Sequence, residues 1–309
     1  MSALLFPGQG SQTVGMGSEF YKNFDQVKNI FKEADERLGF KISKIILEGP
    51  PDKLQLTENT QPAILTVSYS IFKVLIDQFN FNLKSINFFA GHSLGEYSAL
   101  VCSEAINFSD AIYLLHERGK AMQNAVPLGK GSMIAVLGLK INEIEEIVKN
   151  HNKISANGVC EIANDNANGQ VIISGNKENV ENLQISLKKN KIKSIPLNVS
   201  APFHCSLMKP AAEVMREKII STNFKKPNFK IINNVTAKEE FDEEKIKNLL
   251  VDQIFSTVRW RESMLNIEKS GEKKFVEIGP GKALTGMVKR TLKDVNCFSI
   301  NSIADIKSL

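Results

Sequence analysis

Short runs of consecutive apolar residues alternate along this chain with longer segments in which apolar residues recur every three or four positions. The short runs predict buried strands at 3–6, 86–90 and 275–278. The longer segments predict amphipathic helices over 18–38, 61–79 and 110–125. Strands that alternate with helices are typical of an α/β fold with a mostly parallel sheet, which we therefore predict for the body of the chain.

The segment 132–198 has a different rhythm, with two strands in direct succession. It predicts strands at 133–137, 161–164, 170–174 and 193–197, and helices at 142–150 and 177–189. This order is the ferredoxin-like βαββαβ pattern. We therefore expect a small ferredoxin-like subdomain of residues 131–197, inserted into a large α/β unit made of 1–130 and 198–309. The hinges would lie at 129–131 and 198–200.

A glycine-rich turn follows the second predicted strand. Residues 91–95 read Gly-His-Ser-Leu-Gly, and a helix-competent segment begins near Gly95. A G-x-S-x-G turn between a strand and a helix is a nucleophile elbow, which exposes a serine hydroxyl at the end of a parallel sheet. It predicts Ser93 as the nucleophile of an acyl transfer through a covalent ester. The alternative is a structural turn in which Ser93 caps the helix.

A serine nucleophile needs a base, and the chain offers four histidines. His92 lies inside the elbow, where its side chain would point away from Ser93. His116 lies within a predicted helix, and His151 ends a polar one. His204 follows the small subdomain in a proline-containing loop, and the mouth between two units is a suitable place for a base. We therefore predict His204 as the base.

The group that orients His204 stays open at this point. Glu161 and Asp165 precede it but fall in the small subdomain, so a backbone carbonyl or an amide side chain is an alternative. An oxyanion hole needs backbone N–H donors. The amide of Leu94, directly after the nucleophile, supplies one. We expect the second from the loop of residues 8–12.

Composition narrows the function classes. The 309 residues are 42% hydrophobic and 24% charged, and no apolar run approaches the ~20 residues that span a bilayer. The four cysteines lack a C-x-x-C pair, which argues against zinc and a disulfide framework, and Cys205 shows no sign of an activated thiol. Without a basic signal-peptide start, we expect a cytoplasmic protein. The net charge of +5 comes from dispersed lysines, which disfavours nucleic acid and suits an acidic partner.

Several motifs occur together in one order along the chain. They are Pro-Gly-Gln-Gly-Ser-Gln at 7–12, Gly-His-Ser-Leu-Gly-Glu-Tyr at 91–97, Glu-Arg-Gly at 117–119, Phe-His at 203–204 and Glu-Ile-Gly-Pro-Gly at 277–281. Together they make the chain resemble the malonyl-CoA:acyl carrier protein transacylases of type II fatty acid synthesis, over about residues 3–300. The resemblance implies an α/β-hydrolase-like core with an inserted ferredoxin-like subdomain, in agreement with the pattern above.

The resemblance also implies roles for individual residues. Ser93 and His204 match the nucleophile and the base of the family. Arg118 matches the arginine that pairs with the malonyl carboxylate, a fit that a planar guanidinium makes chemically reasonable. Gln12 matches the glutamine whose backbone amide joins that of Leu94 in the oxyanion hole.

Two further matches concern the histidine and the substrate. Gln253 matches a residue whose backbone carbonyl orients the histidine, and Phe203 beside His204 resembles malonyl-selective members.

The implied reaction moves a malonyl group from malonyl-CoA to the phosphopantetheine thiol of an acidic acyl carrier protein, with ping-pong kinetics and no metal or bound cofactor. We expect a monomer without membrane insertion. The alternatives are an acyl-CoA thioesterase or other serine hydrolase, and a non-catalytic scaffold that binds a carrier protein.

Overall fold

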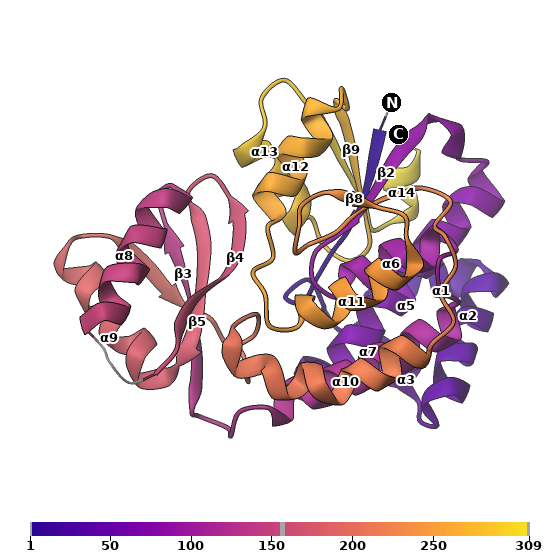
Figure 1. Ribbon diagram of the computed structural model, residues 1–309. Coiled ribbons are helices and arrows are strands. Elements are labelled where there is room, and N and C mark those ends of the chain that lie inside the picture. The colour runs from indigo at the N-terminus through magenta and orange to yellow at the C-terminus, as the bar shows by residue number, and fades with distance from the viewer. Residues whose placement is uncertain (1, 155–157, 308–309) are drawn as a thin grey trace.

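The computed structural model describes residues 2–154 and 158–307, which form two sheets (Figure 1). The larger sheet has the order β10-β9-β1-β2-β7-β8 and is parallel except for the pair β7 and β8. Its strands are β1 (Ser2–Phe6), β2 (Ile86–Gly91), β7 (Lys230–Ile232), β8 (Glu239–Glu240), β9 (Lys274–Ile278) and β10 (Asn296–Ile300). The predicted α/β class with a mostly parallel sheet is confirmed.

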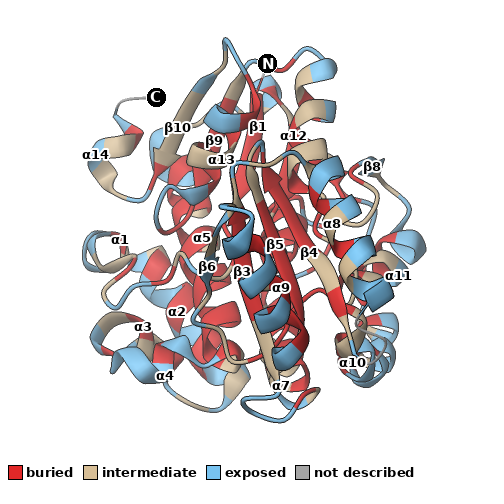
Figure 2. Ribbon diagram, turned by 90° about the vertical axis from the view of Figure 1, so that its left-hand side faces the viewer, coloured by how far each residue is buried: buried red, intermediate tan, exposed pale blue. Residues whose placement is uncertain are grey.

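Helices cover both faces of this sheet. They are α1 (Ser18–Asn23), α2 (Asp25–Leu38), α3 (Ile42–Glu48), α4 (Pro51–Gln55), α5 (Thr57–Phe79), α6 (Gly95–Cys102), α7 (Phe108–Asn124), α10 (Lys209–Ser221), α11 (Glu243–Gln253), α12 (Trp260–Lys269), α13 (Ala283–Thr291) and α14 (Ile303–Ile306), with short 3-10 turns at Leu83–Ser85 and Ser206–Met208. Side chains alternate along a strand, so Leu4 and Phe6 of β1 pack with α5 and α6, whereas Ala3 and Leu5 pack with α12 and α13. Figure 2 shows the buried residues gathered on the strands and the inward helix faces.

The apolar segment 18–38 forms two helices instead of one. Phe24 between them has extended backbone angles, φ −131° and ψ 118°. Its ring stacks on Phe20 and meets the edge of Phe79, so the break lets an aromatic side chain reach the end of α5. Periodicity alone does not reveal such a break, because the apolar spacing continues across it.

The smaller sheet is antiparallel and has the order β4-β5-β3-β6. Its elements are β3 (Gly131–Leu137), α8 (Ile141–Ile154), β4 (Cys160–Ala167), β5 (Gln170–Asn176), α9 (Lys177–Lys189) and β6 (Lys193–Pro196). This succession is the predicted βαββαβ order. It supports the proposed division into a unit of residues 131–197 and a unit of 1–130 with 198–309, of which 1, 155–157 and 308–309 lie outside the described residues.

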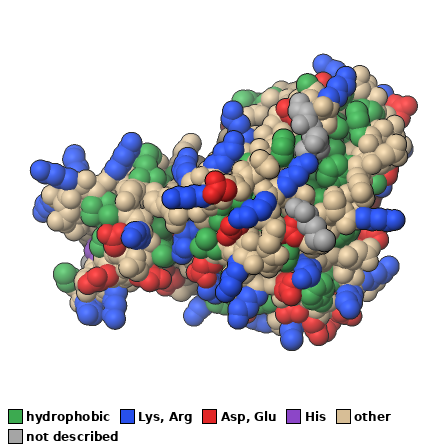
Figure 3. Space-filling model, turned by 90° about the horizontal axis from the view of Figure 1, so that it is seen from above, with side chains coloured by type: hydrophobic (Ala, Val, Ile, Leu, Met, Phe, Trp, Pro, Cys, Tyr) green, Lys and Arg blue, Asp and Glu red, His purple; other side chains and the backbone are tan. Residues whose placement is uncertain are grey.

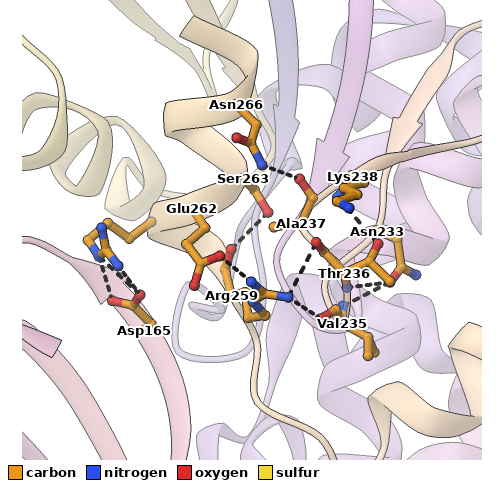
Figure 4. A network of polar contacts seen from close by, with 11 residues as sticks. Asp165, Asn233, Val235, Thr236, Ala237, Lys238, Arg259, Glu262, Ser263 and Asn266 are labelled. Atoms are coloured by element: carbon orange, nitrogen blue, oxygen red, sulfur yellow. Dashed lines mark hydrogen bonds and ion pairs between the residues drawn. The ribbon is translucent and has the colours of Figure 1, made fainter. Parts of the chain in front are cut away.

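Strand β4 of the smaller sheet is joined to the segment between α11 and α12 and to the start of α12. The backbone of Val258 accepts from the amide of Asp165 and donates to the carbonyl of Ala163, both at 2.9 Å. Both carboxylate oxygens of Asp165 also lie 3.0 Å from Nε of Arg261 (Figure 4). These contacts hold one side of the small unit firmly against the large one. Within the described part of the chain, no helix is both long and apolar enough to cross a membrane.

Candidate active site

The predicted elbow lies between β2 and α6, with Ser93 in the left-handed backbone region at φ 53°. A Cβ on Gly91 would lie 1.8 Å from the carbonyl oxygen of Gly95, and one on Gly95 would lie 2.2 Å from that of Phe6. Both positions therefore require glycine. A positive φ at a serine is strained and is typical of functional turns.

Ser93 and His204 form a hydrogen-bonded pair, with 2.8 Å between Oγ and Nε2. On the other side of the ring, Nδ1 lies 2.9 Å from the backbone carbonyl oxygen of Gln253. A carbonyl only accepts, so Nδ1 carries the proton and Nε2 offers its lone pair to the hydroxyl. Burial lowers the pKa of His204 to about 3, and the charge of Arg118 acts in the same direction. The imidazole is therefore neutral and able to act as a base.

The two carboxylates that precede His204 along the chain serve other partners. Glu161 accepts from the backbone amide of Ser206 at 2.8 Å and from its hydroxyl at 2.6 Å. Asp165 pairs with Arg261. The question that the sequence left open is answered by geometry, since it is a backbone carbonyl that contacts the imidazole.

Arg118 projects from α7 toward the serine and is almost completely buried, with 1% of its surface exposed. Its Nη1 donates to Oε1 of Gln61 at 2.7 Å, and its Nη2 donates to Oε1 of Gln253 at 2.8 Å and to Oγ of Ser93 at 3.2 Å. Nε has no partner among the described residues. A buried guanidinium held only by neutral acceptors leaves room for an anionic ligand.

Ser93, Arg118 and His204 open into one cavity of about 260 Å³ between the two units. The large unit contributes a loop, helix α13 and the wall residue Phe203, and the small unit contributes side chains of β3, β4 and β5. A second, more open hollow of about 500 Å³ reaches His204 from the side of α8, and its lining lacks the serine and the arginine. The first cavity is therefore the candidate acyl site.

The two predicted oxyanion donors are the backbone amides of Leu94 and Gln12. The Leu94 amide has no acceptor among the described residues, whereas its side chain is buried in the core. The side chain of Gln12 holds the loop, since its Nε2 donates to Gln55 at 2.8 Å and its Oε1 accepts from the amide of Gly10 at 2.7 Å. Residues 8–11, directly before Gln12, form part of the cavity wall. These bonds occupy the side chain of Gln12 and not its backbone amide, whose part in the oxyanion hole stays a prediction.

Two of the other histidines, His92 and His116, have partners of their own. His92 lines the cavity, but its Nε2 lies 2.8 Å from Oδ1 of Asn166 and its ring meets the edge of Trp260. His116 places Nδ1 2.9 Å from the carbonyl oxygen of Glu58. Neither has the contact to Ser93 that His204 has.

Sequence reasoning missed several polar residues that hold the site. Asn234 accepts from the amide of Ser93 and donates to the carbonyl of Gly91, both at 2.7 Å. Gln61 accepts from Arg118, and Glu96 accepts from the side-chain amide of Gln253. The signal for Asn234 was available, because a polar pair follows the apolar end of β7, and ligand-facing side chains collect at the carboxyl ends of parallel strands.

A strained serine at a strand-to-helix elbow, paired with a neutral histidine, defines a serine enzyme of acyl transfer. The chain also matches the acyl transferase domain family over residues 3–307. It is 41% identical over 301 residues to the malonyl CoA-acyl carrier protein transacylase of Bacillus subtilis, covering 97% of this chain and 93% of that protein. It is 40% identical over 300 residues to the one of Escherichia coli strain K12, covering 97% and 95%. The chain therefore belongs to the malonyl CoA-acyl carrier protein transacylase family and is an acyltransferase.

Solved structures agree with this assignment. The acyl-carrier-protein-S-malonyltransferase of Bartonella henselae superposes with a TM-score of 0.95 at 41% identity, covering 99% of this chain and 97% of that one. A malonyl-transacylase solved in complex with a type II PKS acyl-carrier protein gives a TM-score of 0.94 at 39% identity, covering 99% and 98%. At such identity the likeness extends beyond the fold to the family.

Proposed function

We propose that this acyltransferase moves a malonyl group from malonyl-CoA to the phosphopantetheine thiol of an acyl carrier protein, through a malonyl ester on Ser93, in fatty acid synthesis. We further propose that it acts as a cytoplasmic monomer without a bound cofactor. The names of its relatives support the substrate and the carrier. Within the described residues, no cluster of three or more His, Cys, Asp or Glu side chains is placed to hold a metal.

The observation that carries the proposal is the position of Arg118. Its Nη2 lies 3.2 Å from the nucleophilic oxygen, and its described partners are all neutral. The Glu96 carboxylate acts on Arg118 only through space, without a hydrogen bond between them. A buried charge without a directly bonded counter-ion is costly, and the carboxylate of a malonyl group attached to Ser93 would supply one at the right place. A thioesterase for simple acyl groups has no use for such a residue.

In the first half-reaction, Oγ of Ser93 attacks the thioester carbon of malonyl-CoA while His204 takes the hydroxyl proton on Nε2. The oxyanion is stabilised by the backbone amides of Leu94 and Gln12. The side chain of Gln12 steadies this loop through its bonds to the Gly10 amide and to Gln55. The carbon–sulfur bond then breaks, and CoA leaves with the proton from the imidazole.

In the second half-reaction, the phosphopantetheine thiol gives its proton to Nε2 of His204, and its sulfur attacks the ester carbon. The ester bond to Ser93 breaks, and the serine oxygen regains a proton from the imidazole. Malonyl-carrier leaves, and the site returns to its starting state. The histidine must be neutral at the start of both halves, which its depressed pKa ensures.

Labelled malonyl-CoA, added with and without a carrier protein, tests the proposal against both alternatives. A transferase forms a stable labelled protein that hands the label to the carrier. A thioesterase or other serine hydrolase releases labelled malonate without a carrier, and a non-catalytic scaffold is never labelled. Either of the last two results would overturn the proposed function.

Replacing Arg118 by alanine should slow acylation by malonyl-CoA much more than acylation by acetyl-CoA. Breaking a shielded charge pair costs about 3 kcal/mol, or roughly a hundredfold in kcat/KM for malonyl-CoA. Acylation by acetyl-CoA should suffer much less, because acetyl has no carboxylate. Rates of Ser93 acylation with both thioesters give the comparison. Equal losses with the two substrates would show that Arg118 is structural.

A basic rim is the expected docking place for an acidic carrier. Lys289 and Arg290 are exposed at the end of α13, whose Ala283 and Met287 line the cavity. Arg290 also donates to Oε1 of Gln170 in the opposite wall at 2.7 Å. Figure 3 shows Lys and Arg side chains spread over the upper face, so position near the cavity, and not charge alone, singles out this pair.

Reversing Lys289 and Arg290 to glutamate should raise the KM for carrier protein roughly tenfold at low salt, because exposed charges act chiefly on association. The effect should fade as salt rises, and malonylation of Ser93 from CoA should not change. The matched control is Lys238→Glu with Lys269→Glu, which alters the net charge equally at a hollow lined by β7 and β8 residues. An unaltered carrier KM in the first variant at low salt would rule out this rim.

A further inference from the structure

A carboxylate lies buried beneath the elbow, and no basic side chain in the described part of the chain donates a hydrogen bond to it. Glu96, in the first turn of α6, has 1% of its surface exposed. Its Oε1 accepts from Nδ2 of Asn233 at 2.6 Å, and its Oε2 accepts from the amide of Asn234 at 3.1 Å and from Nε2 of Gln253 at 2.7 Å. All three donors are neutral. Burial raises the pKa of Glu96 to about 7, although these donors and Arg118 oppose the shift.

Gln253 connects this carboxylate to the reacting groups. Its Nε2 donates to Glu96 and also to the carbonyl of Ser93 at 3.1 Å. Its Oε1 accepts from Nη2 of Arg118 at 2.8 Å, and its backbone carbonyl accepts from His204. One buried residue thus contacts the nucleophile, the histidine and the guanidinium, with Glu96 behind it.

The orientation of the Gln253 amide depends on Glu96. A terminal amide has nearly the same shape after a half-turn, so its partners decide which end carries the oxygen. A half-turn here would set the amide oxygen against the Glu96 carboxylate and the Ser93 carbonyl, and the NH₂ against the Arg118 NH₂. Three repulsive contacts would replace three hydrogen bonds. The negative carboxylate therefore holds the oxygen toward Arg118.

The loop after β7 holds Glu96 in turn and cannot adapt freely. Oδ1 of Asn233 accepts from the amides of Val235 and Thr236, at 2.8 and 3.2 Å. Arg259 donates to the carbonyls of Val235 and Thr236 and closes the loop from outside (Figure 4). With its oxygen occupied, Asn233 can offer only its NH₂ to Glu96.

We propose that Glu96 is a positioning residue which fixes the Gln253 amide and thereby aims Arg118 at the carboxylate of the acyl group. The selectivity of the site for a carboxyl-bearing acyl group then depends on a residue that touches neither substrate nor serine hydroxyl. This inference rests on the proposed malonyl transfer, because it deepens the role of Arg118. Gln253 then has two separate functions: its backbone carbonyl orients the histidine, and its side chain orients the arginine.

The variant Glu96→Gln tests this idea, because glutamine keeps the shape and supplies one NH₂ where two acceptor oxygens are needed. That NH₂ meets a donor in either orientation: Asn233 at one end, or Asn234 and Gln253 at the other. In buffer above the pKa of Glu96, kcat/KM for malonyl-CoA should fall roughly ten- to a hundredfold, the cost of a misplaced binding group. Acylation by acetyl-CoA should change by less than about threefold, since His204 keeps its carbonyl. The malonyl preference should therefore fall at least about threefold.

The matched control is Glu277→Gln, another buried carboxylate, which accepts from the amides of Leu284 and Thr285 at 3.1 and 2.7 Å. It should lower the melting temperature without moving the malonyl-to-acetyl ratio. If Glu96→Gln does not fold, Gln253→Met removes the same link while keeping the backbone carbonyl, and it must show the same selective loss.

Equal losses with both thioesters, or an unchanged ratio, in the folded variant would overturn the positioning role. Failure of the proposed function looks different: wild-type protein would not be malonylated, or Arg118→Ala would leave the malonyl preference intact. A normal Arg118→Ala result together with an unmoved ratio in Glu96→Gln therefore rejects only the inference about Glu96.

Discussion

Ser93→Ala should abolish the malonyl adduct and reduce transfer to the carrier by about 10⁶-fold, the size of effect seen when a covalent serine nucleophile is removed. The reason is that the elbow presents a single hydroxyl to both the base and the guanidinium. Oγ of Ser93 lies 2.8 Å from Nε2 of His204 and 3.2 Å from Nη2 of Arg118. Intact-mass spectrometry after mixing with malonyl-CoA should show one adduct in the wild type and none in the variant.

No neighbouring nucleophile is placed to substitute for Ser93. Cys205 is next to the base along the chain, but burial raises its pKa to about 11 and its Sγ lies 3.1 Å from the carbonyl of Pro202. Ser98→Ala is the matched control, because it removes a buried hydroxyl from the same helix α6 that has no partner among the described residues. The adduct should persist in that control. An adduct that persists in Ser93→Ala would show that Ser93 is not the nucleophile.

His204→Ala should slow acylation of Ser93 by about 10²–10⁴-fold, the range for loss of a positioned general base. Both half-reactions need the imidazole, so transfer to the carrier should fall as well. The measurement is a single-turnover rate of malonylation. His116→Ala should leave that rate near the wild-type value, because its ring bonds to the carbonyl of Glu58 outside the cavity. Full activity in His204→Ala would show that His204 is not the base and would make His92 the next candidate.

The pH dependence of acylation provides a second check on His204. The neutral imidazole is the active form, and burial moves the pKa of His204 down from 6.5 to about 3. As pH falls through 6.5, the ring therefore stays neutral, and acylation by acetyl-CoA, which does not depend on Arg118 or Glu96, should not slow there as it would for an exposed histidine. An acid limb near pH 6.5 that disappears in His204→Ala would show that the ring is more exposed to water than the structure has it.

The local chemistry of the site was predictable from the sequence because its constraints are local. The elbow is five consecutive residues, and the steric need for Gly91 and Gly95 arises where strand and helix adjoin. The order of the small unit was also predictable, since each of its elements has its own clear period. Ser93 and the amide of Leu94 followed directly from that reading.

Contacts between residues far apart along the chain could not be predicted from the pattern of residues. His204 lies 111 positions and Gln253 160 positions from Ser93, and no periodicity relates them. The family resemblance, and not the pattern of residues, suggested that a carbonyl of Gln253 would hold the histidine. Resemblance also assigned the backbone amide of Gln12 to the oxyanion hole, directly after the part of the loop that forms the cavity wall.

What the sequence determined by itself was the fold class and the acyltransferase chemistry, with Ser93 as the predicted nucleophile, because backbone geometry and periodicity act over a few residues. Only the tertiary structure decided which polar groups share the buried space behind Ser93. Parallel strands bring their carboxyl ends to one edge, so loops far apart along the chain, such as those of Asn234 and His204, meet there. The layer of Glu96 and Gln253 beneath Arg118 exists only through that packing, since each buried polar group must find partners wherever the fold places them.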